Sequence, residues 1–497
     1  MQSLEITLRP YQIKAIDEIK EALAAYKRVI LQSPTGSGKG LLISELAYKT
    51  SLKGNICLIV SHRIEVVNQN MKHVMNKGTN ASVISASGRK IPTTNVAVAM
   101  AQTLQRRKDK DEWMDYLKSI KLLILDEAHT SEMNFLFQII SPNCFVVGFT
   151  ATPVRYGNQR QLGLDYNAIV TTVQVRELID MGFLCKCRLF GLDAPDLSDV
   201  DFDYSRGDYS LGQMAKKFQS KVKYIGIVDN WENICKGTKT IIFCSSSEQT
   251  IEITKEFISR GYRAKYVLSG SFDEDDEYSG QRKIVMDEFS KGDFDILVNL
   301  GIGTTGLDVP SIKTVILGFS TVSLTKYLQC LGRGSRMHPS KNGEFICLDF
   351  GGNFDKLGLY GQDRVWHLWH NKNPSGPPLV KECPIDKKGC GRLIHISYTD
   401  CPFCGYHFPT SQEIYKIELQ EIVIERTEEE TIGQYVARKK LDGWGNDWIL
   451  RDICHKNGEN PKEAFMGAIK ILNTCHGSKI KPSYWYFFKV HKLSKKG

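Results

Sequence analysis

Short apolar runs rich in β-branched residues recur along the first two thirds of the chain, each followed by a polar loop and then a helix-like pattern. The first group reads RVILQ, NICLIV and KLLIL, and the second reads TKTIIFC, FDILVNL and KTVILGF. Runs that are apolar throughout indicate strands buried on both faces, as in parallel sheets covered by helices on either side. The sequence therefore predicts an α/β fold with two parallel-sheet units.

Two polar segments divide the chain. DAPDLSDVDFDYSRGDYS separates the two groups of strands, and NKNPSGPP follows the second group. Acidic, turn-rich composition of this kind is typical of linkers and boundaries. We expect a first unit over residues 1–190, a linker over 191–236, a second unit over 237–370, a small Cys-rich domain over 380–410 and a helical basic region over 411–497.

The net charge and the apolar pattern of the sequence limit the kinds of partner and the cellular compartment that we expect. The chain has 65 basic and 56 acidic side chains, a net charge of +9, which favours a polyanionic partner without proving one. The amino terminus lacks the pattern of a signal peptide, and no apolar run approaches membrane-spanning length. We therefore expect a soluble cytoplasmic protein that has no membrane partner.

The segment SPTGSGKG lies between an apolar run and a helical pattern. There, backbone N–H groups can converge on phosphates, and Lys39 can reach the β and γ phosphates of a nucleoside triphosphate. A Gly-rich turn without a ligand is the alternative, but strand, loop, Lys and helix in this order favour phosphate binding. The usual last residue is Ser or Thr, whose hydroxyl ligates Mg²⁺, but here it is Gly40. The predicted phosphate loop comprises Ser33, Pro34, Thr35, Gly36, Ser37, Gly38, Lys39 and Gly40.

Asp126 and Glu127 follow the apolar run KLLIL in the sequence DEAH. An acid at the carboxyl end of a strand can hold Mg²⁺, and its neighbour can polarise a water molecule. Two acids after a strand are usually solvated loop residues. Together with a phosphate loop, they predict nucleotide hydrolysis.

Nine segments in order resemble the motifs of superfamily 2 helicases of the DEAH group, closest to phage and bacterial members with a Cys-rich tail. They are LRPYQ, SPTGSGKG, IVSHR, AMAQTL, DEAH, GFTATPVR, IIFCSS, LGIGTTGLDVP and QCLGRGSR. The resemblance implies two RecA-like domains with an ATP site between them. It also implies a bacterial or phage-infected host cytoplasm.

The resemblance carries roles onto individual residues. Gln12 matches the glutamine that reads adenine, and Gln329, Arg333 and Arg336 match the QxxGRxxR motif, whose arginines reach the γ-phosphate from the second domain. Further matches are His62, Arg63, Gln102, Thr150 and Thr152 for nucleic-acid contact or coupling, and Gly306 and Asp308 for the nucleotide.

The implied function is an ATP-dependent helicase or translocase that uses ATP and Mg²⁺ and acts on nucleic acid, with DNA favoured over RNA. Gly40 leaves open a nucleotide-gated clamp with little turnover. The motor subunit of a restriction-type complex is a third reading, although the chain has no acid cluster typical of a nuclease.

Four of the 14 cysteines are clustered in CPIDKKGCGRLIHISYTDCPFCG. Four thiolates in two arms beside Pro and Gly predict a zinc ribbon that binds Zn²⁺ through Cys383, Cys390, Cys401 and Cys404. Four buried thiols are the alternative.

The final segment, GSKIKPSYWYFFKVHKLSKKG, mixes aromatic and basic residues. This mixture suits the binding of a single strand or, equally, apolar packing of the aromatic residues beside a solvated Lys tail.

Overall fold

The computed structural model describes most of the first 369 residues and short pieces of the rest. It divides the chain into two compact units, residues 1–422 and 423–497, and the account below concerns the first. The described residues are 8–88, 90–156, 159–191, 197, 200–204, 207–218, 221–268, 282–300, 309–369, 380–382, 393–395, 406, 420–421 and single positions between 446 and 472.

The first sheet contains, among the described residues, seven parallel strands in the order β3-β4-β2-β5-β6-β1-β7. The apolar runs of the first group form its central strands, so the predicted parallel sheet is confirmed. The strands are β1 (Arg28–Gln32), β2 (Cys57–Ser61), β3 (Ala81–Ile84), β4 (Val96–Met100), β5 (Leu122–Asp126), β6 (Phe145–Thr150) and β7 (Ala168–Thr171).

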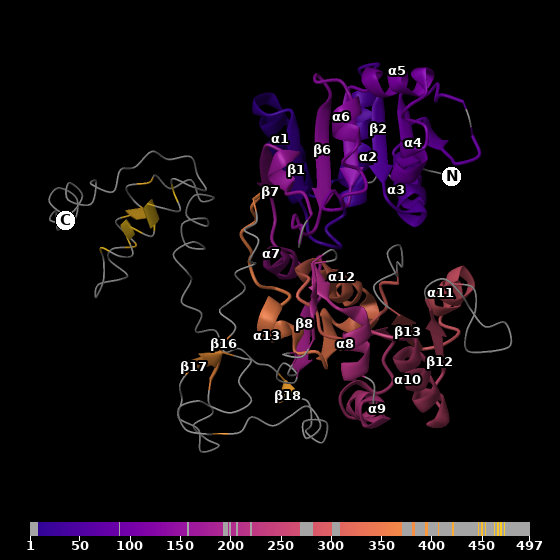
Figure 1. Cartoon of the computed structure of the whole chain (residues 1–497), viewed down its shortest axis with the longest axis vertical. Coiled ribbons are helices and arrows are strands. Elements are labelled where there is room, and N and C mark those ends of the chain that lie inside the picture. The colour runs from indigo at the N-terminus through magenta and orange to yellow at the C-terminus, as the bar shows by residue number, and fades with distance from the viewer. Residues whose placement is uncertain are drawn as a thin grey trace. The chain divides into compact units, whose positions relative to one another are not determined.

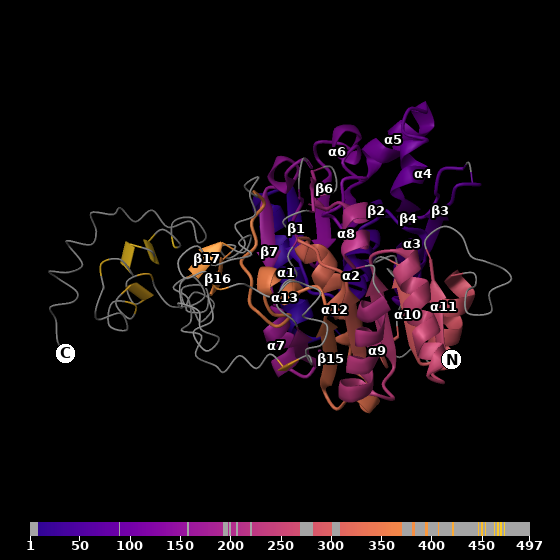
Figure 2. The same ribbon diagram turned by 60° about the horizontal axis from the view of Figure 1, so that its bottom comes forward.

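Helices cover both faces of this sheet (Figures 1 and 2). Successive strand residues point to opposite faces: Leu31 and Ile59 pack against α1, α2 and α3, whereas Ile30 and Leu58 pack against α4, α5 and α6. We call this sheet and its helices the first lobe. The helices are α1 (Pro10–Ala25), α2 (Lys39–Ser51), α3 (Ile64–Asn76), α4 (Ala101–Gln105), α5 (Asp111–Ser119), α6 (Leu136–Ile139) and α7 (Val175–Asp180).

The second sheet has the order β12-β13-β11-β14-β15-β8-β18 among the described residues. All pairs are parallel except that of β18 with β8. This confirms the second parallel-sheet unit. The strands are β8 (Lys186–Gly191), β11 (Thr240–Cys244), β12 (Ala264–Val267), β13 (Ile296–Leu300), β14 (Thr314–Gly318), β15 (Glu344–Asp349) and β18 (Gln420–Glu421).

The second sheet is also covered on both faces, and we call it and its helices the second lobe. One face packs against α9 and α10 through Trp231 and Phe257, and the other against α11 and α12 through Phe289 and Leu331. The helices are α8 (Leu211–Phe218), α9 (Lys221–Cys235), α10 (Ser247–Ser259), α11 (Arg282–Lys291), α12 (Leu324–Gly334) and α13 (Asn353–Leu357).

The described residues between the two groups of strands include strands and helices. The expected end of the first unit at residue 190 falls inside β8, which pairs with β15 over six residues of the second sheet. After β8, the short antiparallel strands β9 (Phe202–Asp203) and β10 (Asp208–Tyr209) precede α8 and α9. The chain therefore enters the second sheet before its polar segment begins.

The predicted zinc ligands Cys383, Cys390, Cys401 and Cys404 lie outside the described residues. Beside them, β16 (Val380–Glu382) pairs antiparallel with β17 (Leu393–His395). Within the described part of the chain, no group of three or more His, Cys, Asp and Glu side chains could hold a metal ion. The eight described cysteines are free thiols. No described helix is long and apolar enough to cross a membrane.

Candidate functional site

The phosphate loop connects β1 to α2 at the carboxyl end of the first sheet. Gly36 and Gly38 both have φ of +87°, a left-handed conformation that glycine adopts without strain. A Cβ on Gly38 would also lie 2.4 Å from Nε2 of Gln12. Both glycines are therefore required by the backbone path, which starts α2 at Lys39 and directs the N–H groups of its first turn toward the loop.

Hydrogen bonds hold the loop in this shape. The Ser37 hydroxyl donates to the Pro34 carbonyl at 2.6 Å and lies 2.6 Å from the Ser33 hydroxyl. From α1, the Tyr11 hydroxyl (2.7 Å) and Gln12 Nε2 (3.0 Å) both donate to the Ser37 carbonyl. The loop is thus fixed from inside and from α1, and Lys39 Nζ folds over it to donate to the Ser33 carbonyl at 3.3 Å.

Gln12 is fully buried, and its amide is engaged with the chain itself. Its Nε2 donates to Ser37, and its Oε1 accepts from the Arg9 backbone N–H at 2.9 Å. The structure therefore places Gln12 as a support of the phosphate loop. Its predicted role in reading adenine stays a prediction.

Asp126 ends β5 and lies buried beside the loop. Its Oδ2 accepts from Asn70 Nδ2 at 2.9 Å, and its Oδ1 accepts from the Glu127 backbone N–H at 3.0 Å. Burial, and then the adjacent charge of Glu127, raises the pKa of Asp126 to about 6. A buried carboxyl with a raised pKa is a group whose ionised form a cation would stabilise.

Glu127 has φ of +57°, one of two positive values among the described non-glycine residues. Such backbone strain occurs at functional sites, where it aims a side chain. In the described part of the chain, no donor hydrogen-bonds its buried Oε2. Burial opposes ionisation of Glu127, but electrostatic interaction with Lys39 first, then with the His129 and His62 rings and with Arg333 from the second lobe, keeps its pKa below the ordinary value. Glu127 is therefore an ionised acceptor aimed into the site.

His129 connects the DEAH segment to the end of β6. Its Nδ1 lies 2.8 Å from the Thr150 hydroxyl and 3.4 Å from Glu127 Oε2, and burial lowers its pKa to about 4. Thr150 in turn accepts from the Thr152 N–H at its hydroxyl (3.1 Å) and from the Ser33 N–H at its carbonyl (2.9 Å). The structure therefore joins Thr150 and Thr152 to both the acids and the phosphate loop.

Arg155 is a buried support of the same segment. Its guanidinium donates to the carbonyls of Ala128 (3.3 Å), His129 (2.9 Å) and Thr130 (3.0 Å), and it pairs with Asp165 at 3.1 Å. The loop that follows Glu127 is thus held by one side chain. Sequence reasoning quoted Arg155 within GFTATPVR but assigned it no role.

The second lobe brings α12 against the phosphate loop. A Cβ on Gly332 would lie 2.7 Å from Cγ2 of Thr35, so only glycine permits this approach. Arg333, in the last turn of α12, is close enough to Glu127 to lower its pKa, and Arg336 forms an isolated β-bridge with Leu184. The predicted arginines therefore lie at the meeting of the lobes. Gln329 lies one turn earlier in α12.

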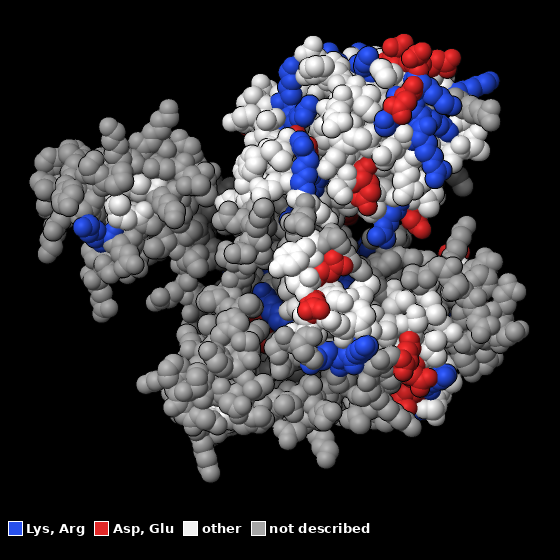
Figure 3. Space-filling model, in the orientation of Figure 1, with Lys and Arg blue, Asp and Glu red and all other residues white. Residues whose placement is uncertain are grey.

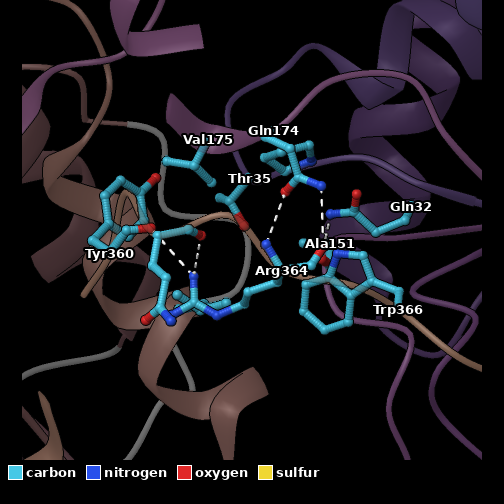
Figure 4. A pocket seen from close by; sticks show the side chains of 11 residues that line it. Gln32, Thr35, Ala151, Gln174, Val175, Tyr360, Arg364 and Trp366 are labelled. Carbon is cyan, nitrogen blue, oxygen red and sulfur yellow. Dashed lines mark hydrogen bonds between the residues drawn. The ribbon is translucent and has the colours of Figure 1, made fainter. Parts of the chain in front are cut away.

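A pocket opens beside the loop where the two lobes meet (Figure 4). Pro34, Thr35 and Ala151 line it from the first lobe, together with Gln174, whose Nε2 donates to the Arg364 carbonyl at 3.0 Å. Leu328 lines it from α12. The remaining lining residues lie outside the motifs, and sequence reasoning gave no role to them or to Gln174: Gln32, Val175, Tyr360, Gln362, Arg364 and Trp366.

The remaining predicted residues are His62, which is near enough to Glu127 to lower its pKa, its neighbour Arg63, and others on α4 or outside the described residues. His62 and Arg63 follow β2, where Arg63 Nε donates to His62 Nε2 at 2.9 Å, and burial lowers the pKa of His62. Gln102 is exposed on α4. Gly306 and Asp308 fall outside the described residues. Lys and Arg side chains are visible on both lobes, interspersed with acidic ones (Figure 3).

The fold and the site together define a two-lobed nucleotide-binding protein with a phosphate loop, an acid pair and arginines from the second lobe. Two family models match the sequence. The one described as "Type III restriction enzyme, res subunit" matches residues 5–155, and "Helicase conserved C-terminal domain" matches residues 222–338.

Individual relatives agree with these models. The "51.5 kDa protein" of a Lactococcus phage is 26% identical over 424 residues, covering 83% of this chain and 85% of its own length. The Saccharomyces cerevisiae protein named "Putative ATP-dependent helicase IRC3" is 29% identical over 360 residues, covering 67% of this chain and 50% of its own length. A fragment of an HsdR subunit of a type I restriction enzyme from Vibrio vulnificus has the same fold, with a TM-score of 0.54 and 21% identity over 71% of this chain and 67% of its own. By these matches the chain contains a domain like that of the restriction-enzyme res subunit and a helicase carboxy-terminal domain, and it is similar to superfamily 2 helicases.

Proposed function

We propose that this protein hydrolyses ATP with Mg²⁺ and uses the cycle to move along nucleic acid, with DNA as its preferred track. The observation that carries the proposal is the ionised, half-buried Glu127, whose buried Oε2 has no hydrogen-bond donor among the described residues and whose pKa is lowered by charges that include Lys39 and Arg333. The match to restriction-enzyme and helicase families supports nucleic acid as the partner and favours DNA.

The residues present fit a magnesium-bound triphosphate. Asp126 is a carboxyl whose pKa is raised by burial and by the charge of Glu127, so a bound cation would stabilise its ionised form, and the loop and the start of α2 offer N–H groups and Lys39 to phosphates. Asp126 would hold the metal, and Lys39 would hold the β and γ phosphates. When bound, Mg²⁺ neutralises charge that develops on the phosphate oxygens.

Glu127 and the arginines supply the chemistry around that charge. Glu127 Oε2 accepts a proton from the attacking water, while His129, neutral because of its low pKa, holds the neighbouring Thr150. Arg333 and Arg336 approach from the second lobe and stabilise negative charge on the phosphoryl group as it is transferred. Because Gly332 lets α12 lie directly against Thr35, movement of the second lobe would add or withdraw these arginines.

Replacing Glu127 with glutamine tests the proposal. Glu127→Gln should lower ATP turnover about 100- to 10,000-fold, because an amide cannot accept the proton from water, whereas nucleotide affinity should stay within about threefold. Glu112→Gln, the same change at an exposed position of α5, is the matched control. For both variants, the measurement is the rate of ATP hydrolysis without nucleic acid, with single-stranded DNA and with single-stranded RNA. Unchanged turnover in Glu127→Gln would overturn the assignment.

The clamp remains the second candidate because Gly40 lacks the metal-binding hydroxyl. The same assay separates it from the motor. Steady-state hydrolysis stimulated by single strands supports the motor, whereas nucleotide-dependent strand binding without turnover would establish the clamp.

The proposal extends to the domains and to the carboxy-terminal part of the chain. We assign the ATP-binding domain to the first lobe and the carboxy-terminal helicase domain to the second, and we keep the zinc ribbon over residues 380–410 and the basic helical region over 411–497. Support for the ribbon comes from the pairing of β16 with β17. Glu382 and Leu393 are partners in this pairing, and they are the residues on either side of the segment that contains Cys383 and Cys390.

A further inference from the structure

The missing hydroxyl of the phosphate loop has a counterpart in α3. A Cβ built on Gly40 would lie 2.5 Å from Cδ2 and 2.7 Å from Nε2 of His73. Real Cβ atoms are not found so close to other atoms, so the imidazole occupies the space where a Ser or Thr side chain would stand. The position of the His73 ring therefore depends on the absence of a side chain at Gly40.

The same helix also supports the other metal-binding residue. Asn70, three residues before His73, donates its Nδ2 to Asp126 Oδ2 at 2.9 Å. Residues three apart on a helix share a face. The face of α3 that carries Asn70 and His73 therefore meets both sides of the proposed metal position, the acid at the end of β5 and the first turn of α2.

The position of Nε2 suits a ligand. The edge of the imidazole that meets Gly40 has Cδ2 and Nε2 at 2.5 and 2.7 Å from the Cβ position, so it brings a nitrogen that can be a metal ligand to the residue whose hydroxyl is missing. Imidazole is a good ligand for transition metals, whereas Mg²⁺ prefers oxygen. Exchanging a hydroxyl for an imidazole should therefore change which divalent ion the site favours.

We propose that Nε2 of His73 replaces the missing hydroxyl as a ligand of the nucleotide-bound divalent ion, and that the site consequently favours Mn²⁺ over Mg²⁺. This inference rests on the proposed function, because it concerns the same nucleotide site. It explains why the loop can end in Gly40 while Asp126, Glu127 and the arginines are all kept.

Metal-dependent nucleotide binding and pulsed electron paramagnetic resonance test the proposal on the full chain. With a non-hydrolysable ATP analogue, His73→Ala should raise the Mn²⁺ concentration needed for half-maximal binding by about tenfold or more and leave the Mg²⁺ requirement less affected. The Mn²⁺ spectrum should show coupling to a nitrogen of His73 that is lost in His73→Ala. Met75→Ala, at a position of α3 that is 60% exposed, is the control and should match the native chain.

The Gly40 side of the pair gives an independent test. Gly40→Thr alone should impair nucleotide binding, because the new side chain meets the His73 ring. The double variant Gly40→Thr with His73→Ala should regain binding with an ordinary preference for Mg²⁺. Nucleotide binding with no nitrogen coupling and an unchanged metal requirement in His73→Ala would overturn the inference and leave the proposed function standing. Absence of nucleotide binding with either metal would remove both.

Discussion

Lys341 is the buried cation beneath the turn that carries Arg336, and replacing it with methionine tests whether that turn depends on it. Its ammonium donates to the carbonyls of Gly334 and Arg336 and, at 3.2 Å, to that of Pro310. The first two carbonyls lie at and just beyond the end of α12, where helix acceptors have no partner in the helix. A cation there also suits the helix dipole.

The magnitude follows from these contacts. Removing the ammonium leaves three carbonyl acceptors without this donor, at a cost of about 1.5–3 kcal/mol each, or about 5–9 kcal/mol together. Burial of the charge acts in the opposite direction. It lowers the pKa of Lys341 from 10.5 to about 8, which corresponds to about 3 kcal/mol of destabilisation of the native fold that Lys341→Met removes. Lys341→Met should therefore destabilise the second lobe by about 2–6 kcal/mol and lower its unfolding midpoint by about 5–20 °C.

Calorimetry at several pH values and ATPase kinetics measure the effect. Between about pH 8 and pH 10.5 the unfolded chain holds a proton on Lys341 that the native chain has released, so the native unfolding free energy rises with pH in this window. Lys341→Met lacks this rise, and the gap between the two proteins should widen from pH 8 to pH 10. Its kcat should fall more than its KM changes, because Arg336 is displaced.

Lys186→Met, the same change at an exposed position of β8, is the control and should leave both midpoint and kinetics near the native values. A Lys341→Met protein with native stability, the native pH slope and native kcat would refute the reasoning.

Two further predictions concern other parts of the chain. Arg155→Lys should destabilise the first lobe by about 3–5 kcal/mol in denaturant unfolding, because one ammonium cannot reach the carbonyls of Ala128, His129 and Thr130 together with Asp165. Arg160→Lys, which alters an exposed partner of the same Asp165, should have little effect, and equal losses would contradict the role of Arg155. For the zinc ribbon, elemental analysis of protein purified without added metal should find about one zinc per chain, and a folded, zinc-free protein would remove it.

The sequence predicted those features that local pattern encodes. Strands buried on both faces appear as continuous apolar runs, and a phosphate loop must combine Gly, Lys and a following helix, so both sheets and the loop could be predicted. In contrast, β8 reads KCRLFG, in which Lys186 and Arg188 interrupt the apolar run. Its place in the second sheet is set by pairing with β15, which lies far away in sequence.

Supports of the site escaped prediction for a related reason. Arg155 acts through backbone carbonyls, which leave no trace in the identity of the residues that carry them. The pairing of Gly40 with His73 joins two helices, so neither residue alone suggests it. Lys341 lies shortly after the QCLGRGSR segment, where the sequence alone suggests an exposed lysine, and only the fold shows that it is buried.

The path of the chain through β8 decides how this protein can be divided into fragments. A cut in the polar stretch after residue 191, which looks like the natural linker, would leave β8 with the first lobe and remove from the second sheet the strand between β15 and β18. The chain passes between the lobes near Leu184 and Cys185, where Leu184 bridges Arg336 and the Cys185 N–H donates to the Ser335 carbonyl at 2.6 Å. A separately expressed second lobe should therefore begin at Cys185, with its first residues already part of the turn that presents the arginines.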